Sequence, residues 1–186
     1  MKTNFDIEKI VESGLISNEL DYERALIADR KLRLLAKESI HFKNLRSKLR
    51  DLIVKYENSE WSDVNLIDEN KLLENEKFEH IAELERVFIE NRKQYIRKQL
   101  KEFDLTQENL ALILGHKSKT HMSELINGIK TFTLKDLIII NRILKIDITL
   151  LIPLFLSKED QLRVKDAVKK LDKPKLKLNA ADLVLS

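Results

Sequence analysis

The chain has 186 residues, of which 43% are hydrophobic and 35% are charged, and its formal net charge is +3. This balance is ordinary for a folded protein and excludes a chain that is disordered throughout. The absence of cysteine excludes disulfides and thiolate metal sites, and three glycines with two prolines leave little punctuation for strands, so we expect an all-α protein.

The charges are unevenly distributed along the chain. Residues 57–90 carry 11 acidic and 3 basic side chains, whereas residues 91–145 carry 11 basic and 5 acidic ones. The densest apolar stretch, residues 143–156, contains charged residues and a proline and is too short to span a bilayer. We therefore expect a soluble, cytoplasmic protein with no membrane partner and with its positive charge concentrated in one block.

Helical periodicity dominates the first half of the chain. Residues 20–35 and 45–56 place apolar side chains at steps of three and four, which predicts two amphipathic helices. Residues 58–65 are rich in turn formers and indicate a loop. From residue 68 to residue 103 the helical period resumes, and it fits either one long helix or two helices joined by a bend. His41 and His80 are expected on solvated helix faces.

The next segment carries sharper signals. Residues 107–114 and 119–127 predict two short helices, and residues 134–144 predict a longer one. Their starts and ends are marked by capping and terminating residues: Thr106, Gly115, Ser118, Asn127-Gly128, and Thr133 with Asp136. Two short helices around a tight turn, followed by a support helix, are the layout of a helix-turn-helix module.

The second short helix has the chemistry for reading duplex DNA, which requires polar groups on one face and apolar residues on the other. Met122, Leu125 and Ile126 form the predicted inward face. The outward side chains can bond to base edges, while the helix N-termini and nearby lysines can bind phosphates. The candidate DNA-binding residues are Gln107, Lys117, Ser118, Lys119, Thr120, His121, Glu124 and Lys130.

Other chemistries find little support in the sequence. His116, His121 and Glu124 lie close in sequence, but the spacing of the two histidines places them on different sides of a helix turn, so no metal site is expected. No glycine-rich phosphate loop, nucleophile elbow or supported carboxylate pair is present. We therefore expect neither an enzyme nor a bound cofactor.

The C-terminal part of the chain indicates self-association. Residues 143–156 contain more aliphatic side chains than one helix of a small domain can bury, and a two-fold dimer would read a palindromic operator. The candidate dimer-interface residues are Leu150, Leu151, Leu154 and Phe155. Residues 157–171 predict one more amphipathic helix, and the tail from Pro174 is either disordered or a short strand.

Residues 88–155, including LTQENLALILGHKSKTHMSELINGIKTFTLKDL, resemble the lambda-repressor-like XRE helix-turn-helix domain. Within that group they look most like the HigA-type antitoxins. The features that carry this resemblance are Gly115, the pair Lys117-Ser118, and Gly128 with Lys130, Thr133 and Leu134. Residues 22–26, followed by helices, are similar to the helical extension that precedes the DNA-binding domain of those antitoxins, whereas the extension past Leu156 departs from the short members.

The resemblance implies a three-part organisation: an N-terminal helical, toxin-binding region over residues 1–87, a five-helix lambda-repressor-like domain over residues 88–156, and a C-terminal helix and tail over residues 157–186. It implies the antitoxin of a type II toxin-antitoxin system, which represses its own operon and neutralises a small basic RelE/HigB-like toxin that cleaves mRNA.

The acidic residues 57–90 are either a solvated helix face or a surface for such a basic toxin. The candidate toxin contacts are Glu60, Asp63, Asp68 and Glu69. The alternatives to an antitoxin are a one-component XRE-family repressor without a toxin and a helical protein-protein adaptor.

Overall fold

The computed structural model describes residues 6–62, 69–154, 156, 158–173, 175, 176 and 178. All regular secondary structure in these residues is helical, which confirms the predicted all-α fold. The elements are α1 (Ile7–Ser13), α2 (Glu19–Leu35), α3 (Ile40–Glu60), α4 (Glu69–Glu102), α5 (Gln107–Leu114), α6 (Lys119–Asn127), α7 (Leu134–Leu144), the 3-10 helix η2 (Ile148–Leu150) and α8 (Lys158–Leu171). None of the described helices combines the length and the apolarity needed to cross a membrane.

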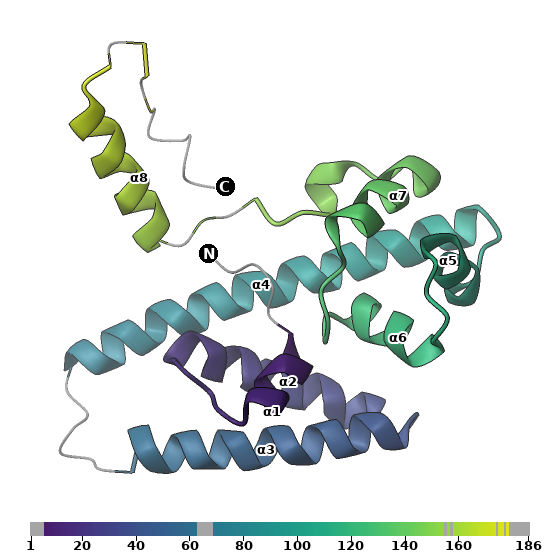
Figure 1. Cartoon of the computed structure of the whole chain (residues 1–186), viewed down its shortest axis with the longest axis horizontal. Coiled ribbons are helices and arrows are strands. Elements are labelled where there is room, and N and C mark those ends of the chain that lie inside the picture. The colour runs from purple at the N-terminus through teal and green to yellow at the C-terminus, as the bar shows by residue number, and fades with distance from the viewer. Residues whose placement is uncertain are drawn as a thin grey trace.

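The long helix α4 organises the molecule. Figure 1 shows it beside α2 for part of its length and beside α5 and α7 towards its C-terminal end, while α8 lies apart. Helix α2 packs on both α3 and α4, and α4 in turn packs on α5, α6, α7 and η2. Of the two predicted alternatives for this segment, the single long helix is therefore the observed one. The domain boundary proposed between residues 87 and 88 falls inside this continuous helix.

The N-terminal helices have their own hydrophobic core. It is formed by the apolar faces of α2 and α3 together with Ile7 of α1, and these faces have the predicted helical spacing. Helix α1 itself was not predicted, and α3 extends to Glu60, three residues into the expected loop. Ile129 belongs to this same core although it follows α6, and its carbonyl accepts a hydrogen bond from the N–H of Ile7 at 3.1 Å.

A second core lies where α5, α6 and α7 pack against the end of α4. It includes Ile96 and Leu100 of α4, and it also contains Leu151, which is fully buried. The prediction that Leu151 lies in a dimer interface is wrong, because η2 turns the chain back against α4 and places this side chain inside its own domain. Leu150 packs partly against the same core, Leu154 is exposed, and Phe155 lies outside the described residues.

Local capping sets the boundaries of the short helices as the sequence predicts. The hydroxyl of Thr106 accepts the N–H of Asn109 at 3.1 Å, and the hydroxyl of Ser118 accepts the N–H of His121 at 3.2 Å. Gly115 and Gly128 end α5 and α6 with φ of 81° and 71°, in the left-handed region that glycine adopts without strain.

The remaining C-terminal predictions have mixed outcomes. Thr133 and Asp136 form the expected capping box at the start of α7, with reciprocal bonds between side chain and backbone. The predicted helix over residues 157–171 is present as α8, whose described range begins at Lys158. Pro174 and most of the tail, for which a short strand was one alternative, lie outside the described residues.

Candidate nucleic-acid interface

Helix α6 separates its apolar and polar residues as the sequence predicts for a DNA-reading helix. Met122, Leu125 and Ile126 are almost fully buried and belong to the core formed with α4, α5 and α7. This packing fixes α6 against its support helices from one side. The side chains on its other sides are therefore held in a defined direction, as base readout requires.

The first turn of α6 presents its polar groups to solvent. Lys119 is 81% exposed, and its ammonium contacts a carboxylate oxygen of Glu108 in α5 at 2.7 Å. Lys117 and Ser118 are exposed just before the helix, and Thr120 is partly exposed. Because the N-terminal residues of a recognition helix are the ones that reach base edges, this turn is the accessible part of the candidate interface.

Glu124 corrects the predicted interface. We expected it to face the groove, but its side chain is only 3% exposed. It does lie on the side of α6 away from the apolar core, and that side is covered by α1 and α3, which the sequence of the helix alone does not reveal. The prediction that Glu124 is an exposed DNA contact is therefore wrong.

The buried carboxylate instead joins three parts of the chain. An oxygen of Glu124 lies 2.6 Å from Nε2 of His41 at the start of α3, and its other oxygen lies 3.1 Å from the ammonium of Lys130. Glu8 of α1 contacts both His41, at 3.2 Å, and Lys130. We call Glu8, His41, Glu124 and Lys130 the junction cluster. It links the N-terminal helices directly to α6.

Within the junction cluster, the ammonium of Lys130 lies against the buried carboxylate of Glu124. Burial alone would raise the pKa of Glu124, but hydrogen bonds from Lys130 and His41 outweigh it and hold that pKa below its ordinary value. One ligand atom each from Glu8, His41 and Glu124 lies within 4.8 Å of the others, a spacing that suits a metal ion. The ammonium of Lys130 already contacts both carboxylates, so the cluster holds a cation of its own.

Two further candidate DNA contacts are engaged within the protein. Lys130 is committed to the junction cluster and is 22% exposed. His121 is 35% exposed, and its ring contacts Glu124 at 3.4 Å and packs edge-on against the ring of His116 at 4.9 Å between centroids. At the start of α5, Gln107 is partly exposed. Only some of the candidate DNA-binding residues therefore lie together on an accessible surface.

The structure also adds residues that sequence reasoning missed. Ser123 lies one turn after Lys119 and is partly exposed, so it extends the polar face of α6; its spacing of four residues from Lys119 was the available signal. His41 was expected on a solvated face, and its side chain is 42% exposed, but it also belongs to the junction cluster. No local signal indicated this role, since its partner is 83 positions away.

Two of the candidate toxin contacts are described: Glu60 lies at the end of α3 and Glu69 at the start of α4. Glu60 and Glu69 are exposed, and Glu60 lies 3.8 Å from the ammonium of Lys71. Asp63 and Asp68 lie outside the described residues.

Comparison with known proteins assigns one part of the chain to a described family of domains. Residues 96–151 match the family model described as Helix-turn-helix, and they form a helix-turn-helix domain of the XRE type. The match spans the end of α4 together with α5, α6, α7 and η2, and it lies within the region predicted from the sequence. The curated proteins and the solved structures give no match to this chain.

Proposed function

We propose that this chain, which carries an XRE-type helix-turn-helix domain over residues 96–151, is a transcriptional regulator that reads operator DNA with the first turn of α6. The observation that carries the proposal is the separation of faces on that helix. Three almost fully buried side chains anchor it, while Lys119, Thr120 and Ser123 stay accessible on its polar side.

Each of these side chains has a chemical role in the proposal. Lys119 donates to a guanine edge or a phosphate, and Thr120 and Ser123 exchange hydrogen bonds with bases or phosphates. Lys117, with the N–H groups at the start of α6, binds phosphate. Glu124 is left out because it is buried, and Lys130 because it is committed to the junction cluster.

Operator binding tests this assignment. Lys119→Ala and Thr120→Ala should each weaken binding to the chain's own promoter DNA by about 1–3 kcal/mol per lost base contact, measured by fluorescence anisotropy at fixed salt. Lys48→Ala removes an exposed lysine from α3 and serves as the control, with little expected change. Unchanged binding in both α6 variants would favour the protein-protein adaptor instead.

We further propose that the regulator is the antitoxin of a type II toxin-antitoxin system, binding a small basic RelE-like toxin through the acidic surface around Glu60 and Glu69. The support is the resemblance of residues 88–155 to HigA-type antitoxins and the excess of acidic side chains in residues 57–90. A toxin that grips RNA is basic, so opposite charges would favour association.

Co-expression with the neighbouring gene product separates the two regulators. A copurifying basic protein that is released by the double variant Glu60→Lys, Glu69→Lys supports the antitoxin. Purification of the chain without any such partner, with operator binding intact, supports a one-component repressor.

The homodimer that a palindromic operator requires would use Leu150 and Leu154. Sedimentation of the full chain in the analytical ultracentrifuge measures whether this dimer forms.

A further inference from the structure

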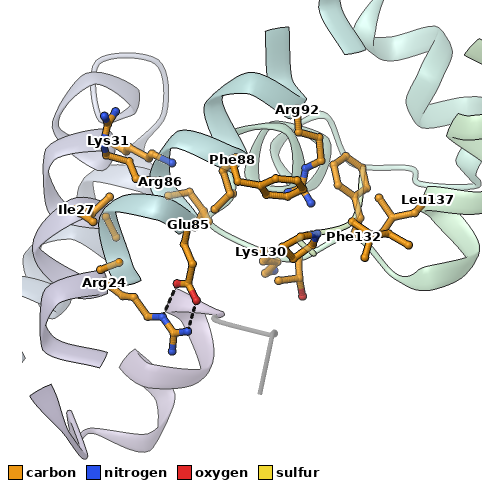
Figure 2. Close-up of a pocket in the computed structure, with 18 of the residues that line it drawn as sticks. Arg24, Ile27, Lys31, Glu85, Arg86, Phe88, Arg92, Lys130, Phe132 and Leu137 are labelled. Carbon is orange, nitrogen blue, oxygen red and sulfur yellow. Dashed lines mark hydrogen bonds and ion pairs between the residues drawn. The ribbon is translucent and has the colours of Figure 1, made fainter. Parts of the chain in front are cut away.

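A cavity of about 270 Å³ lies between the N-terminal helices and the helix-turn-helix domain. Its walls come from α2, from the middle of α4 and from residues 128–132, the segment that directly follows α6 (Figure 2). Ile27, Phe88, Ile89 and Phe132 give it a largely apolar lining. Pockets that hold small molecules have this character: they are concave, mostly apolar, and placed where two parts of a fold meet.

The charged side chains around the cavity are mostly basic, and most of them are paired. Three cations have carboxylate partners: Arg24 with Glu85 at 2.6 Å, Arg86 with Glu83 at 2.6 Å, and Lys130 with Glu124 at 3.1 Å. The lining cations that remain are Lys31 and Arg92, and neither forms an ion pair with any residue that the structure describes.

Arg92 is the more deeply buried of these two cations, with 7% of the residue exposed. Its guanidinium lies 5.5 Å from the ring centre of Phe88 and 5.2 Å from that of Phe132. Figure 2 shows Arg92 next to these two side chains. Its hydrogen bond is to the carbonyl of Leu151 at 3.5 Å, the long end of the useful range. Burial without a compensating charge lowers the pKa of Arg92 to about 10. A guanidinium has five N–H donors, and among the described residues the carbonyl of Leu151 is the acceptor that Arg92 bonds to.

Lys31 reaches the cavity from α2. Its ammonium donates a hydrogen bond to the carbonyl of Asn127 at the end of α6, at 3.3 Å. Burial lowers the pKa of Lys31 to about 8, and although Glu90 opposes that shift, the positive charges of Lys93, Arg86 and Arg92 add to it. Two of the cations on this largely apolar cavity, Lys31 and Arg92, therefore lack a carboxylate partner among the described residues.

We propose that this cavity binds a small organic anion, an apolar body carrying a carboxylate that pairs with Arg92, while Lys31 adds a second positive charge to the cavity wall. The apolar body packs against the phenylalanine and isoleucine side chains, and the carboxylate accepts guanidinium N–H groups in the two-point geometry that arginine favours. The space suffices, because apolar cavities of about 150 Å³ already accept benzene.

Binding of simple carboxylates to the full chain tests the proposal. The probes are benzoate, phenylacetate and octanoate, each paired with its neutral amide, and binding is followed by isothermal titration calorimetry and by shifts of the protein's methyl signals in NMR spectra. At least one carboxylate should bind about ten-fold or more tightly than its amide, since hydrogen bonds to a charged group in a dry site are worth that much. Equal affinity for acid and amide, or no saturable binding by any probe, overturns the proposal.

Variants locate the site. Arg92→Gln should weaken carboxylate binding by about ten-fold or more and leave amide binding unchanged. Arg97→Gln removes the same charge from the exposed side of the same helix and should change neither. Because Arg92→Gln can also disturb the packing of α4, Lys31→Met provides a second test. It removes a half-buried charge that lacks a carboxylate partner among the described residues, and it should weaken carboxylate binding about three-fold or more in a folded protein. Full affinity in both variants overturns the proposal.

Discussion

The two short helices of the helix-turn-helix segment and the junction with the N-terminal helices use polar side chains in different ways. Thr106, Ser118 and Thr133 bond to groups three residues away and define where helices begin. Glu124 and Arg24, by contrast, bond to partners 83 and 61 positions away and fix how helices lie against one another. Local polar residues thus shape α6, whereas distant ones hold it in place.

Loss of Glu124 is expected to be among the most destabilising changes. Glu124→Ala leaves Lys130 and His41 with Glu8 as their remaining carboxylate partner and should lower the free energy of unfolding by about 2–3 kcal/mol, measured by urea denaturation. Glu108→Ala removes an exposed carboxylate, 60% exposed, and should cost less than about 0.5 kcal/mol. Similar costs for both variants would remove the distinction between the junction and the surface.

The pH dependence of stability gives a second test of the Glu124 carboxylate. The pKa of Glu124 is lowered in the folded protein, so its contribution to stability is present above the pKa of the unfolded chain and is lost as the pH falls through the folded value. The wild-type chain should therefore lose stability in acid more steeply than Glu124→Ala, provided that the remaining carboxylates titrate alike in both.

The two glycines that end α5 and α6 offer a matched pair. A Cβ at Gly128 would lie 2.6 Å from Cγ2 of Ile89 in α4, whereas a Cβ at Gly115 would meet nothing within 4 Å. Both have positive φ, so Gly115→Ala should cost about 1 kcal/mol from backbone strain, and Gly128→Ala about 2–3 kcal/mol because overpacking is added. Thermal unfolding of the two variants measures the difference, and equal costs would mean that Ile89 moves aside freely.

Removal of an uncompensated charge should stabilise the protein. Lys31→Met is expected to raise the free energy of unfolding by about 1–2 kcal/mol at pH 7, after allowance for the lost bond to Asn127. Because the pKa of Lys31 falls from 10.5 to about 8 on folding, the unfolded chain holds this proton more tightly, and wild-type stability rises between those two pH values. The advantage of Lys31→Met should therefore shrink from pH 8 to pH 10.5. If the extra stability of Lys31→Met stayed constant over this pH range, the lowered pKa of Lys31 could not be its cause.

The smallest effect on stability is expected at the proposed DNA-reading turn. Lys119→Ala breaks an exposed ion pair with Glu108 and should change the free energy of unfolding by less than about 0.5 kcal/mol, measured by urea denaturation. Its effect on operator affinity is proposed to be larger. A variant that loses both stability and DNA binding to the same degree would place Lys119 in the scaffold instead.

The sequence predicts best where the deciding interactions are local. Capping residues, terminating glycines and apolar spacing located α5, α6, α7 and the buried face formed by Met122, Leu125 and Ile126. Each of these signals acts within a few residues, so a single sequence contains it.

The burial of Glu124 could not be predicted from local sequence. Helical geometry does direct it away from the core that anchors α6, and only the fold of residues 6–62 brings α1 and α3 over it. The burial of Leu151 also depends on distant segments. Its sequence position suggested a dimer contact, but η2 directs this side chain into the core of its own domain. Such contacts depend on how distant segments meet, and no local pattern records them.

Ile129 shows what this architecture means for protein engineering. It follows α6 in the chain, yet it is fully buried among the N-terminal helices and bonded to Ile7 through its carbonyl. A fragment limited to residues 96–151 would expose the side chain of Ile129 and the carboxylate of Glu124 to solvent. Transfer of residues 96–151 to another protein should therefore give a folded domain only when residues 6–62 and the whole of α4 are included.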